Sequence, residues 1–81
     1  MRKVIHELKI LPEYFWEVFL GHKTFEIRKN DRDFKTGDMI ILREWNSDSK
    51  SYTGNKLARK IIYILKDVDG LKKDYVLMSI V

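Results

Sequence analysis

The sequence predicts a small, mainly β domain with one helix, in which about five strands form a closed or partly closed barrel plugged by that helix. With 81 residues the chain has room for one hydrophobic core, so we expect a single domain over residues 1–81. One segment near the N-terminus has apolar residues at helical spacing, whereas the segments after it are short, apolar and separated by turn residues, as strands are. The main alternative is an open α+β sheet.

The first strand and the helix are predicted from VIHELKI and PEYFWEVFLG. Apolar and polar side chains alternate over residues 4–10, as in a half-buried strand. Pro12 suits a first helical turn, and Gly21 favours a stop at the C-terminal end. We therefore expect a helix over Pro12–Leu20 whose apolar stripe is formed by Phe15, Val18 and Phe19.

Four more strands complete the predicted order β-α-β-β-β-β. KTFEIRK alternates with a period of two, and we expect Phe25 and Ile27, together with Phe34, to anchor it to the barrel. MIILREW has a continuous apolar start, which is typical of a strand buried on both faces. LARKIIYILK is long enough to bend, and YVLMSIV forms the last strand. Turns are expected at residues 30–33, 35–38 and in DVDG, with a polar loop at Asn46–Gly54.

Composition indicates a soluble globular protein, with 44% hydrophobic and 35% charged residues. No apolar run approaches the roughly 20 residues that cross a bilayer, and no signal peptide is evident, so no membrane partner is expected. The absence of cysteine fits a cytoplasmic protein. Two histidines without ligand spacing predict no metal site, and no motif for a cofactor is present. The net charge of +4 is compatible with a partner that carries phosphate.

The segment GHKTFEIR concentrates ionisable groups around a short strand. Glu26 and Arg28 are two residues apart, so their side chains share a face and can form an ion pair. Lys23 follows the predicted helix end, where the helix dipole favours a cation. The structural interpretation is a surface ion pair that contributes about 0–1 kcal/mol to stability.

The pattern G-x-K-x-x-E-x-R in this segment resembles the signature of the ASCH domain, a branch of the PUA-like superfamily of small β-barrels. A Phe-x-x-Gly-Asp turn follows it, at Phe34, Gly37 and Asp38. With HELKILPEYF at the start and YTG before the fourth strand, nearly the whole chain resembles a short bacterial and phage family described as a domain of unknown function (DUF3850). The resemblance implies a PUA-like (ASCH) barrel in which the motif residues line a cleft beside the helix.

The resemblance also implies that the domain binds RNA or recognises a nucleotide or modified base. Lys23, Arg28 and nearby cations such as Arg32 would meet phosphate, and Glu26 would accept hydrogen bonds from a base or hold Arg28 in place. Four aromatic residues could complete the core or stack on a base: Trp16, Trp45, Tyr52 and Tyr63. Trp16 lies off the helical stripe and is expected to be partly exposed. Tyr52 is the best stacking candidate. His6, on the apolar face of the first strand, is either a core residue with one hydrogen bond or a ligand contact.

Two other functions stay open. Some ASCH proteins are amidohydrolases that deacetylate N4-acetylcytidine with the motif Lys, a Thr and a Glu. Here Lys23 is kept, but Glu26 stands in the place of that Thr, Thr24 is at another position, and the later Glu has no clear counterpart in YTGNKLARKIIYILK. We therefore favour a binding protein over an enzyme. If the protein is an enzyme, Lys23 and Glu26 would be its acid–base pair. The other alternative is a protein-interaction module that uses the exposed sheet edge and Trp16.

Overall fold

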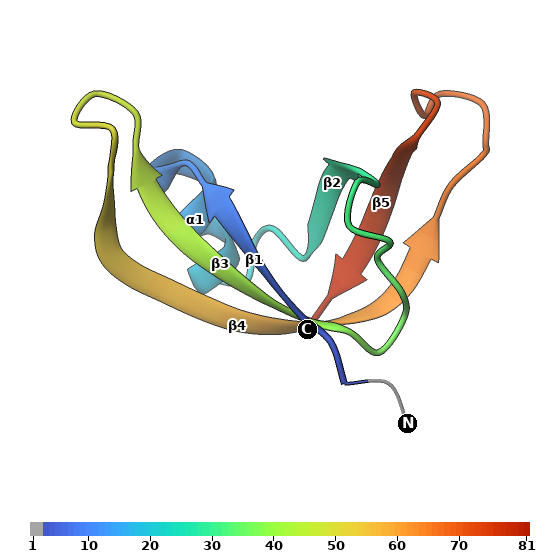
Figure 1. Cartoon of the computed structure of the whole chain (residues 1–81), viewed down its shortest axis with the longest axis horizontal. Coiled ribbons are helices and arrows are strands. Elements are labelled where there is room, and N and C mark those ends of the chain that lie inside the picture. The colour runs from blue at the N-terminus through green and yellow to red at the C-terminus, as the bar shows by residue number, and fades with distance from the viewer. Residues whose placement is uncertain (1–2) are drawn as a thin grey trace.

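The computed structural model describes residues 3–81 as one curved sheet of five strands with a single short helix (Figure 1). The mainly β class and the order β-α-β-β-β-β confirm the predicted fold class. The predicted polar loop is shorter than expected, because its last residues already belong to a strand. The elements are β1 (Ile5–Ile10), α1 (Pro12–Phe19), β2 (Phe25–Lys29), β3 (Met39–Asn46), β4 (Ser51–Leu65) and β5 (Tyr75–Ile80).

The sheet is mixed and has two free edges. Its strands follow the order β1-β3-β4-β5-β2, with β1 parallel to β3 and every other pair antiparallel. Figure 1 shows the sheet bent into a U, with β1 and β3 in one arm and β5 and β2 in the other. Within residues 3–81 no strand ladder joins β1 to β2, so the sheet is strongly curved without closing. We call the line along which these two edges face each other the seam.

The long strand β4 connects the two arms. Its first part pairs with β3 and its last part with β5, and the register shifts between Ile61 and Tyr63. Such a bulge bends a strand and increases its twist. The expectation that LARKIIYILK is long enough to bend is thus confirmed by a strand of 15 residues (Figure 1).

The core lies on the inner face of the curved sheet, where α1 packs. Phe15 and Val18 are each 2% exposed, as the helical spacing predicts. Phe19, expected on the same stripe, is 56% exposed, so the buried stripe of α1 consists of Phe15 and Val18 alone. Trp16 is 44% exposed, as expected from its position off the stripe. No helix of the described chain is long and apolar enough to cross a membrane.

In β3 the continuous apolar run is buried fully on one face only. Ile40 and Leu42 are completely inaccessible, whereas Ile41 on the other face is half-buried. The expectation of a strand buried on both faces is therefore only partly met. The outer face stays accessible because the one helix covers the inner side of the sheet.

The two faces of β2 are reversed relative to the prediction. Phe25 and Ile27, expected to anchor the strand, are 45% and 53% exposed, whereas Glu26 is 3% exposed. Glu26 lies opposite the buried Met78 of β5, which places its side chain on the core side of the sheet. Phe34 is 3% exposed and is the expected anchor that does enter the core. A carboxylate can replace an apolar residue on this face because the neighbouring cations Lys23 and Arg28 neutralise it.

Candidate functional site

The end of α1 determines where Lys23 lies. Gly21 has a φ of 80°, a left-handed conformation that glycine adopts without strain. Its N–H donates to Val18 O at 3.0 Å, and the N–H of His22 donates to Glu17 O at 3.0 Å, which together form a Schellman motif. The N–H of Lys23 donates to the same Glu17 oxygen at 3.0 Å. The chain therefore reverses tightly after the helix and brings Lys23 next to β2.

Lys23, Glu26 and Arg28 form a compact ionic group, which we call the Glu26 cluster. Lys23 Nζ donates to Glu26 Oε1 at 2.6 Å, and Arg28 Nε donates to Glu26 Oε2 at 3.0 Å. Lys23 Nζ also donates to the carbonyl oxygen of Phe25 at 2.7 Å. Both carboxylate oxygens of Glu26 thus have a cationic partner, which compensates for burial of the charge.

The cluster carries one net positive charge at the wall of a cleft. The Lys23 and Arg28 side chains are 16% and 26% exposed, so both cations are reachable although Glu26 is not. Each cation has N–H donors in addition to those that it uses within the protein. An anionic group in the cleft could accept hydrogen bonds from these donors.

Arg28 also links the two edges of the sheet. Its Nη2 donates to the carbonyl oxygen of Lys9, in β1, at 2.8 Å. Because Arg28 belongs to β2, this hydrogen bond joins the two edge strands across the seam. One guanidinium therefore orients both the buried carboxylate and the opposite strand.

The first of two clefts along the seam, the helix cleft, lies between α1, the end of β1 and β2. Its volume is about 650 Å³, within the range of small-molecule sites. The Glu26 cluster forms its polar wall, and Tyr14, 48% exposed, lines it from the helix. The remaining lining residues are Lys9, Ile10, Leu11, Glu17, His22, Phe25 and Ile27.

The second, the loop cleft, lies between β1 and the segment that follows β2. It has a volume of about 470 Å³ and a more polar lining. Lys9 and Arg28 line it as well as the helix cleft, and the hydrogen bond from Arg28 to Lys9 O joins these two shared residues across the seam. Its other lining residues are Glu7, Leu8, Lys29, Asp31, Arg32, Phe34 and Tyr52.

The predicted site residues divide between these clefts, with one exception. Lys23, Glu26 and Arg28 come together in the helix cleft, and Arg32 and Tyr52 lie in the loop cleft. His6 lines neither of them.

His6 is instead part of the packing beneath the turn before β3. It is 7% exposed, its Nε2 lies 2.8 Å from Asp38 Oδ2, and its ring contacts Phe34 edge to face at 4.7 Å. Asp38 Oδ2 also accepts the N–H of Lys35 at 3.0 Å, so the histidine stabilises that turn. This arrangement matches the structural interpretation of His6.

Sequence reasoning missed Lys9 and Tyr14. Their positions follow from the way the two sheet edges face each other, and a single sequence does not encode that pairing locally. The available signal was weak: Lys9 alternates outward from the apolar face of β1, and Tyr14 lies off the apolar stripe of α1. Within residues 3–81 no three His, Cys, Asp or Glu side chains are grouped so as to hold a metal ion.

Comparison with known proteins places the chain in a family. The uncharacterized 12.9 kDa protein in the GpA 3′ region of Escherichia phage P2 is 38% identical over 78 residues, which are 96% of this chain and 69% of the phage protein. A family model described as a domain of unknown function (DUF3850) matches residues 5–80, which include both clefts. The chain therefore belongs to the DUF3850 family.

Proposed function

We propose that the helix cleft binds a nucleotide or modified base, and that RNA is the polymer that carries it. The observation that carries this proposal is the Glu26 cluster, in which a buried carboxylate holds two partly exposed cations at the wall of a cleft. The apolar part of the same cleft, with the exposed ring of Tyr14, suits a base. Phosphate and base would therefore meet different walls of one site.

In this proposal Lys23 and Arg28 bind the phosphate and Glu26 positions them. A carboxylate that is 3% exposed and accepts from both cations is poorly placed to read a base edge. Its effect on the ligand is exerted through Arg28, whose guanidinium it orients. Of the two roles expected for Glu26, the positioning role is the one that we propose.

The fold offers further support by analogy. We propose that the DUF3850 domain is a member of the ASCH group of PUA-like folds, because Lys23, Glu26 and Arg28 of the G-x-K-x-x-E-x-R pattern line a cleft beside the helix of a curved sheet. Fold likeness alone does not assign a function. The chemistry of the cleft has to carry the proposal.

The test is a calorimetric titration of the protein with uridine, cytidine, adenosine and guanosine monophosphates at low salt. Lys23→Met should weaken binding roughly 10- to 100-fold, the range for loss of a charged hydrogen bond. Lys60→Met is the matched control, because Lys60 is exposed on β4 and lines neither cleft. Binding of no nucleotide, or equal affinities for the two variants, would overturn the proposal.

The amidohydrolase alternative is motivated by the 2.6 Å contact between Lys23 Nζ and Glu26 Oε1, which is within reach for proton transfer. In an enzyme of this kind the pair would transfer protons to and from the substrate. However, Glu26 already accepts from Arg28, and it stands in the place of the hydroxyl side chain of the known deacetylases. We expect little or no cytidine when the protein is incubated with N4-acetylcytidine. Turnover near about 1 per second, ordinary for an enzyme, would favour catalysis instead.

A further inference from the structure

We infer that the helix cleft and the loop cleft form one continuous groove, and that its ligand is a single-stranded nucleic acid whose neighbouring nucleotide lies in the loop cleft against Tyr52. This inference rests on the proposed function, since the first nucleotide occupies the helix cleft. It adds a second subsite, at Tyr52, and the single-stranded form of the polymer.

The continuity of the groove follows from shared walls. Lys9 and Arg28 line both clefts, and the hydrogen bond from Arg28 Nη2 to Lys9 O lies at the junction. Both clefts are lined by residues of β1 and β2, the two edge strands of the sheet. A chain that enters the helix cleft can therefore continue past Arg28 without leaving the protein surface.

The charge of the loop cleft suits a phosphate backbone. Its cations, Lys9, Arg28, Lys29 and Arg32, outnumber its carboxylates, Glu7 and Asp31. Because Arg28 lies between the two clefts, a phosphate that links the two nucleotides would lie close to its guanidinium. Cations spaced along a groove are typical of proteins that follow a single-stranded backbone.

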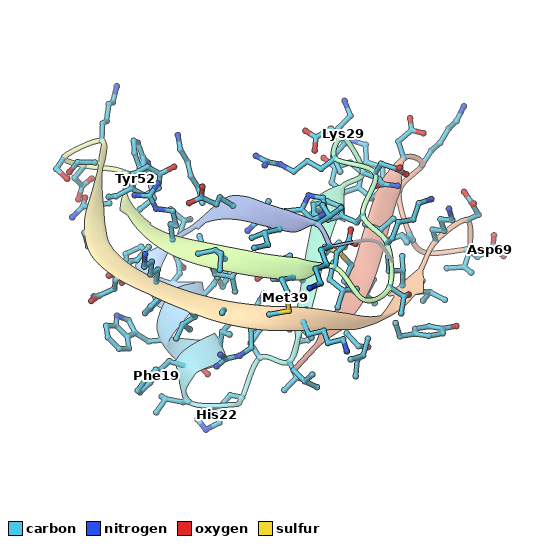
Figure 2. The ribbon with its side chains drawn as sticks, turned by 60° about the horizontal axis from the view of Figure 1, so that its bottom comes forward. Phe19, His22, Lys29, Met39, Tyr52 and Asp69 are labelled. Carbon is cyan, nitrogen blue, oxygen red and sulfur yellow. The ribbon has the colours of Figure 1, made fainter. Side chains whose placement is uncertain are left out.

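An aromatic platform stands at the far end of the loop cleft. The Tyr52 and Trp45 rings contact each other edge to face, with their centres 4.9 Å apart. Arg43 Cζ lies 3.8 Å from the centre of the Tyr52 ring, and Lys9 Nζ lies 3.9 Å from the centre of the Trp45 ring. Tyr52 is 39% exposed. Figure 2 shows Tyr52 and Lys29 on the upper side of the ribbon, with Phe19 and His22 below it. Unpaired bases stack on such rings and on guanidinium planes.

The hairpin that carries Tyr52 is preorganised by hydrogen bonds within the protein. Glu44 is 4% exposed, and its Oε1 accepts hydrogen bonds from Thr53 Oγ1 at 2.7 Å and from Asn55 Nδ2 at 3.0 Å. Trp45 and Tyr52 are directly paired across β3 and β4. Because the platform is already ordered, binding costs little conformational entropy of the protein. A base that is already unstacked can bind to it directly. This favours a single strand over a duplex.

The experiment measures binding of fluorescein-labelled uridylate oligomers of increasing length by fluorescence polarisation, with uridine monophosphate as an unlabelled competitor. Affinity should rise from the mononucleotide to short oligomers and then level off. Tyr52→Ala should weaken oligomer binding roughly 5- to 100-fold, as expected for loss of one stacked base, and should leave the mononucleotide unaffected. Tyr52→Phe should behave like the unchanged protein.

Tyr63→Ala is the matched control, because Tyr63 is 59% exposed on β4 and lines neither cleft. A circular dichroism spectrum of each variant checks its fold. Deoxyuridylate oligomers form a parallel series: tighter binding of the ribose strand assigns RNA, and equal binding assigns single strands of either sugar. If the mononucleotide binds in the helix cleft as tightly as the longest oligomer, or if Tyr52→Ala matches Tyr63→Ala, the inference fails while the proposed function stands. If no mononucleotide binds, the proposed function fails and the inference with it.

Discussion

At the scale of single residues, the buried charge of Glu26 depends on its two partners. Glu26→Gln keeps the size of the side chain but leaves Lys23 and Arg28 facing a neutral amide in a mostly buried position. Losing hydrogen bonds of this charged kind should lower the free energy of unfolding by about 1–3 kcal/mol. Urea denaturation measures the change.

The control is Glu7→Gln, because the Glu7 side chain is 66% exposed and its Arg43 partner is 3.8 Å away. That substitution should change the free energy of unfolding by less than about 0.5 kcal/mol. Equal effects of the two substitutions would mean that the Glu26 cluster contributes no more than a surface ion pair.

The same residues show what could be read from the sequence. The spacing of Glu26 and Arg28 predicted a shared face, and the structure confirms that they pair. The direction of that face was predicted wrongly, because a period of two does not say which side of a strand faces the core. Their apolar character suggested that Phe25 and Ile27 face the core. Instead Glu26 does, because Lys23 and Arg28 neutralise its carboxylate and so make its burial possible. The signal in the sequence was Glu26, a single acidic residue flanked by Lys23 and Arg28, which indicated that its face of β2 could be the buried one.

At the scale of elements, the end of α1 connects the helix to the site. Gly21→Ala forces a Cβ atom into a left-handed conformation with a φ of 80°. We expect a loss of about 1 kcal/mol in stability, equivalent to a fall of about 4–8 °C in melting temperature for a domain of this size. Lys23 should also shift, so nucleotide affinity should fall. Thermal unfolding and calorimetry measure the two effects.

Lys50→Gly serves as the opposite control, because Lys50 is a non-glycine residue with a φ of 53° in the β3–β4 hairpin. There the substitution relieves backbone strain, and stability should stay nearly constant or rise. A melting temperature for Gly21→Ala that is no lower than that for Lys50→Gly would contradict the role of the Schellman motif.

The seam is the second feature at this scale. Arg28→Lys keeps the charge but removes the planar group that donates to Glu26 and to Lys9 O together. Backbone amides of β2, an edge strand, should therefore exchange hydrogen faster, whereas those of the central strands β3 and β4 should be unaffected. Exchange followed by mass spectrometry tests this. Unchanged exchange in β2 would show that the cross-seam hydrogen bond does not hold that edge.

The elements themselves were largely predictable, and the way they close was not. One helix, a bent β4 and a final apolar strand follow from local periodicity and turn residues. Whether β1 and β2 join depends on the curvature of the whole sheet, which the bulge near Ile61 helps to set. The two clefts arise because those edges stay apart, so their full lining could not be derived from local pattern.

At the scale of the whole molecule, the net charge of +4 is less informative than where the charge lies. Among residues 3–81, five cations line the two clefts along the seam: Lys9, Lys23, Arg28, Lys29 and Arg32. Carboxylates of the same clefts offset part of this charge, so fewer phosphates than cations should be neutralised. For about three phosphate contacts with a single strand, log affinity should fall with log salt at a slope near −2.

Arg32→Gln should then flatten that slope by about 0.7, the value for one contact with a single strand. The change should appear for the uridylate oligomers and be absent for uridine monophosphate, because Arg32 lines the loop cleft alone. Lys23→Met should instead reduce the slope for both ligands, because Lys23 lies in the helix cleft. Lys60→Met, which removes one charge outside both clefts, should leave every slope as it was. If all three substitutions shift the slope equally, the protein attracts nucleic acid through its total charge, and the seam has no special part in binding.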